Sequence, residues 1–159
     1  MRPLLLLGLI GCVPNSPDLL QPRIRVTGDV ERDGEVLAFS GETLVDLEPA
    51  LVGDTGFNTL GFLDGDEPAW IGLFIDGQGL LEPGDTVPIA HPARQERHAR
   101  LDWQELETGF ESRPFDNTGL PTDGVVTFLE PQDGAQRFAI EATIDGQRTL
   151  SLDVEWGAL

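Results

Sequence analysis

The chain has 159 residues, of which 28 are acidic and ten are basic, and its formal net charge is −18. A protein with this charge repels the phosphate backbone, which excludes nucleic acid as a partner. Two interpretations of the acidity stay open: a salty habitat or biased codon usage, and a specific cationic partner.

Near the start of the chain, Arg2 precedes an apolar run from Leu4 to Ile10 that only Gly8 interrupts. The small residue Gly11 follows this run. A positive start, a short apolar run and a small residue before the cleavage point are typical of a secretory signal. The run is too short to span a bilayer, which requires about 20 apolar residues. We therefore expect residues 1–11 to be a signal peptide that is removed. The alternative is a buried strand that places Cys12 in the core.

Cys12 is the only cysteine of the chain, and it closes the tetrapeptide Leu9-Ile10-Gly11-Cys12. This tetrapeptide resembles the lipobox of bacterial lipoproteins, and the resemblance covers residues 1–12 only. It implies that Leu9, Ile10 and Gly11 flank the signal cleavage site and that Cys12 is the lipid attachment residue. Two or three acyl chains hold a protein at a membrane almost permanently, since each buried methylene contributes about 0.8 kcal/mol.

The resemblance also implies a location and a domain order. Lipoproteins retained at the inner membrane commonly carry Asp after the cysteine, whereas this chain has Val13. That difference implies the cell envelope, and there the outer membrane, at its periplasmic face or at the cell surface. Residues 12–22 contain three prolines and no periodicity, so we expect a lipidated tether. We expect residues 23–159 to form a single acidic β domain, which at this length folds without disulfides.

Glycines and prolines divide the rest of the chain into short apolar runs, a spacing typical of all-β folds. We expect strands near residues 23–30, 35–40, 57–63, 69–75, 86–91, 98–104, 123–130, 136–144 and 147–156. Asp-Gly pairs at 33–34, 64–65, 76–77, 123–124, 133–134 and 145–146 are the expected turns, because Gly accepts positive φ and Asp bonds its own backbone. The predicted fold class is all-β, a mostly antiparallel β-sandwich or partly closed barrel of about eight or nine strands.

The register of the last hairpin follows from the parity of its apolar residues. Both strands carry their apolar side chains at even positions, and residues directly opposite one another share a face. A three-residue loop of Ile144, Asp145 and Gly146 satisfies this rule and sets Ile140 opposite Leu150. The same reasoning at Arg32-Asp33-Gly34 sets Val30 opposite Val36.

The segment from His91 to Arg100 is the one basic island of the chain, and it contains Arg94, Arg97 and Arg100. The guanidinium fork binds carboxylate and phosphate, so these three arginines are candidates for binding an anionic glycan, a lipid headgroup or an acidic partner. The alternative is a solvated loop, or a loop folded onto the protein's own acidic surface.

The sequence gives little support for catalysis or for a cofactor. No Gly-x-Ser-x-Gly elbow is present, and His91 and His98 lack the spacing of a zinc-binding helix. We therefore assign no catalytic residue and expect no cofactor. The acid-rich segments Asp64–Glu67 and Asp76–Asp85 supply oxygen ligands suited to calcium without the EF-hand pattern, so the metal question stays open. The three tryptophans, Trp70, Trp103 and Trp156, are of a kind that can stack on sugars, but in a chain with few aromatic residues we expect them to be core anchors.

These patterns predict a lipid-anchored envelope lipoprotein whose β domain is a non-catalytic structural or binding module of unknown ligand. Its expected partners are the membrane, through the lipid anchor, and an envelope protein or an anionic glycan. Two alternatives remain: a tethered hydrolase that acts on envelope polymers, and a calcium-stabilised adhesion-type domain.

Overall fold

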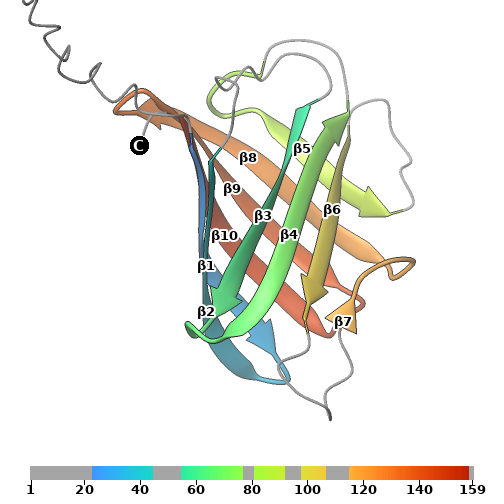
Figure 1. Cartoon of the computed structure of the whole chain (residues 1–159). Coiled ribbons are helices and arrows are strands. Elements are labelled where there is room, and N and C mark those ends of the chain that lie inside the picture. Colours follow the sequence, from blue (N-terminus) through green and yellow to red (C-terminus); the bar gives the residue numbers. More distant parts are fainter. Residues whose placement is uncertain (1–22, 45–54, 77–80, 92–97, 107–114, 158–159) are drawn as a thin grey trace, which may run out of the picture.

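The structure of the protein is a computed structural model that describes residues 23–44, 55–76, 81–91, 98–106 and 115–157. The predicted signal peptide, Cys12 and the tether lie outside these residues. The described residues form ten strands and no helix, which confirms the all-β prediction (Figure 1). The strands are β1 (Arg23–Arg32), β2 (Glu35–Leu44), β3 (Thr55–Leu63), β4 (Glu67–Asp76), β5 (Thr86–His91), β6 (His98–Glu105), β7 (Phe115–Asp116), β8 (Thr122–Gln132), β9 (Ala135–Ile144) and β10 (Arg148–Gly157).

The strands belong to one sheet with the order β4-β3-β2-β1-β10-β9-β8-β5-β6-β7. In addition β4 pairs with β6, from Ala69 opposite Glu105 to Asp76 opposite His98. This pairing joins the two ends of the sheet, so nine strands form a ring and β7 is attached to β6 outside it. All pairings are antiparallel except that of β5 with β6. The ring agrees with the predicted sandwich or partly closed barrel.

Two junctions of the ring are much shorter than the others. Strands β2 and β3 pair over three residues, from Phe39 opposite Leu63 to Gly41 opposite Gly61. Strands β5 and β6 share a single pair, Ile89 opposite Ala99. These two junctions divide the ring into a panel of β3, β4 and β6 and a larger panel of β5, β8, β9, β10, β1 and β2.

Alternate side chains along each strand point into the ring and form one core. In β10 Leu150, Leu152 and Val154 are at most 2% exposed, whereas the residues between them face solvent or the rim. Rings from opposite walls meet inside: Phe39 of β2 lies 5.2 Å from Trp103 of β6, and Phe57 of β3 lies 6.0 Å from Phe138 of β9. The apolar side chains therefore fill the space across the ring.

Four of the predicted Asp-Gly turns join consecutive strands. Asp33, Asp64, Asp133 and Asp145 have φ between 46° and 55°, and the glycine after each also has positive φ. Asp tolerates this conformation better than most residues, and Gly adopts it without strain. Asp123-Gly124 is not a turn but lies within β8, where Gly124 stands opposite Ala142. Gly77 lies outside the described residues.

The predicted registers of two hairpins are wrong by small shifts. In the last hairpin even residues do face even residues, but Ile140 stands opposite Leu152 rather than Leu150. The loop consists of residues 145–147, because Asp145 and Gly146 both take positive φ and the backbone N–H of Gln147 donates to the carbonyl of Ile144.

The first hairpin has a two-residue loop instead of the three-residue loop expected. Arg32 pairs directly with Glu35, so Val30 stands opposite Leu37. Val36 consequently points outward and is 62% exposed, and the inward position passes to Leu37, which is 4% exposed. A two-residue loop of positive-φ residues matches the twist of the strands, which accounts for the outcome.

The short β2–β3 junction depends on glycine. A Cβ placed on Gly61 would lie 2.5 Å from Cζ of Phe39 and 2.6 Å from the carbonyl oxygen of Ser40. We therefore expect Gly61→Ala to lower the free energy of unfolding by about 1–3 kcal/mol, as overpacking does in other cores. Urea unfolding followed by tryptophan fluorescence measures the change.

The matched control is Ser40→Ala, which alters an exposed side chain at the same junction and should change stability by less than about 0.5 kcal/mol. Equal stability of Gly61→Ala and the parent protein would show that the junction tolerates a side chain.

Candidate functional site

The outer surface of the smaller panel differs from the rest of the molecule, and we call it the β3–β4–β6 face. It is turned toward the reader in Figure 1. Strand pairing arranges its side chains in four rows across the three strands. The rows are Gly56, Phe74 and Arg100; Asn58, Gly72 and Asp102; Leu60, Trp70 and Gln104; and Phe62, Pro68 and Leu106, the last joined by the N–H of Leu106 to the carbonyl of Pro68.

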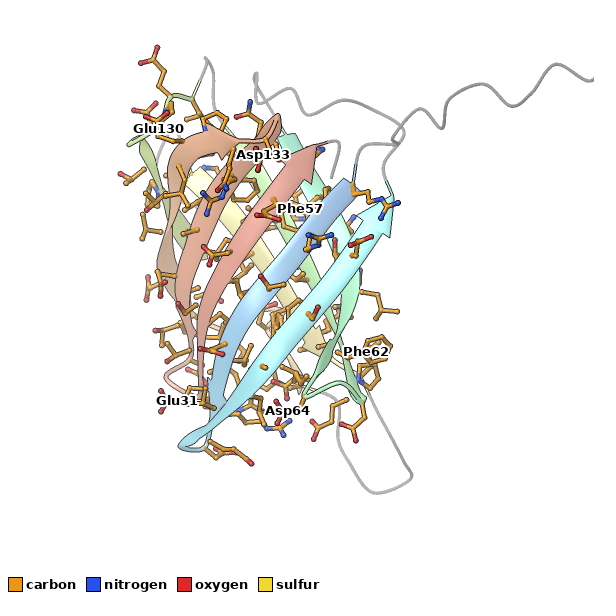
Figure 2. The ribbon with its side chains drawn as sticks, turned by 90° about the vertical axis from the view of Figure 1, so that its left-hand side faces the viewer. Glu31, Phe57, Phe62, Asp64, Glu130 and Asp133 are labelled. Carbon is orange, nitrogen blue, oxygen red and sulfur yellow. The ribbon has the colours of Figure 1, made fainter. Side chains whose placement is uncertain are left out.

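This face gathers most of the exposed large apolar side chains of the described residues. Leu60 is 49% exposed, Phe62 is 44% exposed and Leu106 is 40% exposed, and Val36 is the one other such residue. Figure 2 shows Phe62 projecting away from the ring. Within the four rows Arg100 is the one positive and Asp102 the one negative residue, and the pair Asp76 and His98 follows next along β4 and β6. The four rows thus combine apolar and polar side chains and carry no formal net charge, on a protein of net charge −18.

Trp70 forms the centre of the β3–β4–β6 face. A Cβ on Gly72 would lie 3.0 Å from Cη2 and 3.3 Å from Cζ3 of Trp70, and 2.7 Å from Oδ1 of Asn58. The six-membered ring of the indole therefore lies over Gly72 with the Asn58 amide beside it. The lack of a side chain at Gly72 makes room for both groups.

The prediction that all three tryptophans are core anchors is correct for Trp103 and Trp156 and wrong for Trp70. Trp103 is 0% and Trp156 is 7% exposed, whereas Trp70 is half-buried on the outer surface. The outward position of Trp70 could not be predicted from the sequence, because β4 carries large apolar residues at both odd and even positions.

Arg100 is the one member of the predicted anion site that the structure describes, and Arg94 and Arg97 lie outside the described residues. The Arg100 guanidinium lies 4.7 Å from the centre of the Phe74 ring, and its Nη2 lies 3.1 Å from Oδ2 of Asp102. Its charge is thus already opposed by a carboxylate. Anion binding by the three arginines together stays a prediction.

A surface pocket of about 260 Å³ adjoins Arg100 at the free edge of β6. It is lined by Arg100, Leu101, Asp102, Asn117, Thr118 and Gly119. Asn117 is buried and replaces a missing strand: its Oδ1 accepts from the N–H of Trp103 at 2.9 Å, and its Nδ2 donates to the carbonyl of Leu101 at 2.8 Å. The side-chain amide of Asn117 is therefore satisfied within the protein, and this residue has no signature in the sequence.

An ionic cluster closes the interior at the end of the ring opposite to Arg23. Arg148 is buried and donates to both oxygens of Glu105, at 2.7 Å and 3.1 Å. Arg32 donates to Glu67 at 2.8 Å and to Glu105 at 3.4 Å. The guanidinium of Arg148 also lies 4.3 Å from the centre of the Phe115 ring. The cluster joins β1, β4, β6 and β10 and attaches β7 to them.

The ionisation of this cluster follows from its contacts. Burial by itself would raise the pKa of Glu105, but hydrogen bonds from Arg148 and Trp103 and the charges of Arg148 and Arg32 outweigh it and lower that pKa. Hydrogen bonding to Glu67 raises the pKa of Arg32 against the effect of burial. Glu105 and Arg32 are therefore charged at neutral pH, and their contacts join strands of the ring.

The acid-rich segments considered for calcium use several of their carboxylates inside the protein. Oδ1 of Asp64 accepts from the N–H of Ala38 at 2.8 Å, Glu67 binds Arg32, and Oδ2 of Asp85 accepts from the N–H of Glu82 at 2.9 Å. Within the described ranges no group of three or more His, Cys, Asp or Glu residues is placed to hold a metal ion.

The two histidines considered for catalysis lie at strand ends. His98 begins β6 and is half-buried, and His91 ends β5 with its side chain outside the described set. The described part of the chain also contains no helix able to cross a membrane.

Compared with protein family models, with curated proteins and with solved structures, the chain gives no match in any of the three. The interpretation of the site therefore depends on its own residues.

The lowered pKa of Glu105 predicts acid sensitivity. A carboxyl group whose pKa is lower in the folded than in the unfolded state stabilises the fold above the unfolded pKa of about 4.3, and this contribution is lost as the pH falls further. Glu105→Gln should therefore lower the free energy of unfolding at pH 7 by about 3 kcal/mol, since it leaves Arg148 buried without a counterion. The difference from the parent should shrink below about pH 4.3, as measured by urea unfolding at several pH values.

The control for this prediction is Glu67→Gln, because the Glu67 side chain is 42% exposed and its ion pair is screened by water. We expect a loss below about 1 kcal/mol. A Glu105→Gln difference that stays constant from pH 7 to pH 3 would contradict the assignment.

Proposed function

We propose that the protein is a lipid-anchored lipoprotein of the cell envelope whose β domain is a non-catalytic binding module, with the β3–β4–β6 face as its binding surface. The anchor is proposed from the resemblance of residues 1–12 to lipoprotein signals. The binding role is proposed from one observation: exposed aromatic and aliphatic side chains gather in four rows without formal net charge, on an otherwise strongly acidic protein.

The exposure of adjacent apolar side chains on this face supports a binding role. An exposed Leu or Phe in isolation is ordinary, but contiguous apolar patches rimmed by polar groups mark interaction sites. Leu60, Phe62 and Leu106 lie in two adjacent rows around Trp70. The outer positions of β1 and β10, by contrast, carry four acids and two arginines: Asp29, Glu31, Asp153, Glu155, Arg23 and Arg25.

The geometry of the chain is compatible with a tethered binding module. Arg23, where the tether would join the domain, pairs with Gly157 at the end of the ring opposite the ionic cluster. The β3–β4–β6 face lies on the side of the ring rather than at either end. A domain suspended from residues 12–22 would therefore hold this face away from its own attachment point and open to the surrounding envelope.

The anchor is tested by the mass of the protein after expression in a bacterium. We expect residues 1–11 to be absent and Cys12 to carry a diacylglycerol, so that the protein partitions into the detergent phase. Cys12→Ser is the control and should remain at the unlipidated mass in the aqueous phase. A bare Cys12 or a retained Met1 in the parent protein would refute the anchor.

The binding role is tested by passing detergent-solubilised envelope over the immobilised lipidated protein and analysing retained protein and carbohydrate. We expect material to be retained by the parent and lost with Trp70→Ala. The control is Leu129→Ala, which truncates a half-buried apolar side chain on the outer surface of β8. Equal retention by all three proteins would exclude the β3–β4–β6 face as the binding surface.

A further inference from the structure

We propose that the ligand of the β3–β4–β6 face is an uncharged glycan chain, stacked on Trp70 and hydrogen-bonded by the polar side chains beside it. This inference rests on the proposed binding role and names its ligand class. The sequence patterns favour a core position for Trp70, whereas the structure places it on the outer surface.

The size of the face argues against a second copy of the chain. Its four rows extend over about 20 Å along β4, and its three strands over about 10 Å, from the usual spacings in sheets. A stable protein–protein interface buries about 800 Å² per partner, several times this area. Two copies would also bring together two proteins of net charge −18. The face therefore fits a narrow, extended ligand.

The charge of the face argues against an anionic ligand. Arg100 is the sole cation on it, and this cation is already opposed by Asp102 at 3.1 Å. The field of the acidic protein repels other anions. An uncharged glycan is not repelled by this field, and it is bound through hydrogen-bonding groups rather than through counterions.

The arrangement around Trp70 matches the two-sided chemistry of a sugar ring. Cη2 and Cζ3 of the Trp70 indole lie against Gly72, and an aromatic ring offers an apolar platform for the C–H side of a sugar. Asn58 and Asp102 flank Gly72 in the same row, and Gln104 stands beside Trp70. Amide and carboxylate groups accept from hydroxyls, and the amides also donate. A few fixed polar groups around an aromatic surface are typical of small-ligand sites.

Phe74 and Phe62 extend the platform along the strand direction. Phe74 is held between Gly56, where a Cβ would lie 2.6 Å from its Cδ1, and the Arg100 guanidinium. Phe62 is exposed on β3, one row beyond the row of Trp70. Apolar rings near both ends of the face favour a ligand of several sugar units over a single sugar.

The proposal is tested by isothermal titration of the purified lipidated protein, in a detergent without a sugar headgroup, with cellotetraose, chitotetraose and mannotetraose. Tetragalacturonate supplies the anionic comparison. We expect at least one neutral tetramer to bind, with an affinity at least tenfold above that of tetragalacturonate. Tryptophan emission should shift on binding, since Trp103 and Trp156 are buried in the core and Trp70 is half-buried on the outer surface.

Variants assign the binding to this face. Trp70→Ala should weaken the affinity at least tenfold, and Trp70→Phe, which keeps an aromatic platform, should restore most of it. Asn58→Ala should weaken binding without a change in melting temperature, while Leu129→Ala should leave the affinity unchanged. The melting temperature of each variant verifies that it is folded.

Three results would overturn the proposal. The first is no binding of any neutral tetramer to the folded parent. The second is binding that survives Trp70→Ala. The third is preferential binding of tetragalacturonate. If the neutral tetramers fail but a protein is retained from the envelope in a Trp70-dependent manner, the binding role stands and the glycan assignment alone is wrong.

Discussion

The pairing of β4 with β6 is the constraint on which the rest of the structure depends. It runs over eight residue pairs and joins the two ends of a long sheet. Closure gives every strand of the ring one enclosed side, so a single set of alternating apolar residues suffices for the core. It also places Trp103 opposite Phe39 and brings Glu105 to Arg148. A chain with this excess of acid therefore obtains a contiguous core without disulfides in its described part.

Repulsion between carboxylates is reduced in two ways in this protein, by solvent at the surface and by arginine counterions in the ionic cluster. Most carboxylates of the described residues lie outside, where water screens their repulsion. Glu105 and Glu67 lie where the ring must be closed at one end, and two of the arginines are placed there as their counterions. Burying such a cluster contributes little net stability, but it penalises any arrangement that separates its members. Its effect is therefore to fix which strands meet at that end.

Local patterns in the sequence predicted the strands and the alternating hairpins well, and predicted their connections less well. The expected strands all appear, because Asp-Gly turns and period-2 alternation are local signals. The errors arise where a choice is made by tertiary context. The loop at Asp33-Gly34 is one residue shorter than the parity of the apolar residues indicated. The outward orientation of Trp70 could not be predicted from alternation, because β4 carries apolar residues on both of its sides. Asn117 had no signal, since its role depends on the gap that it fills along β6.

The two short junctions of the ring have a consequence for its motion. The long junctions of the ring pair six or more residues, whereas β5 and β6 share a single pair and β2 and β3 share three. Because fewer backbone hydrogen bonds hold these two junctions, we expect them to open at a lower free energy than global unfolding and to act as hinge lines. The panel that carries Trp70 is bounded by both. Amide exchange along these lines would then proceed by a rocking of one panel against the other, and a ligand lying on the small panel would slow it.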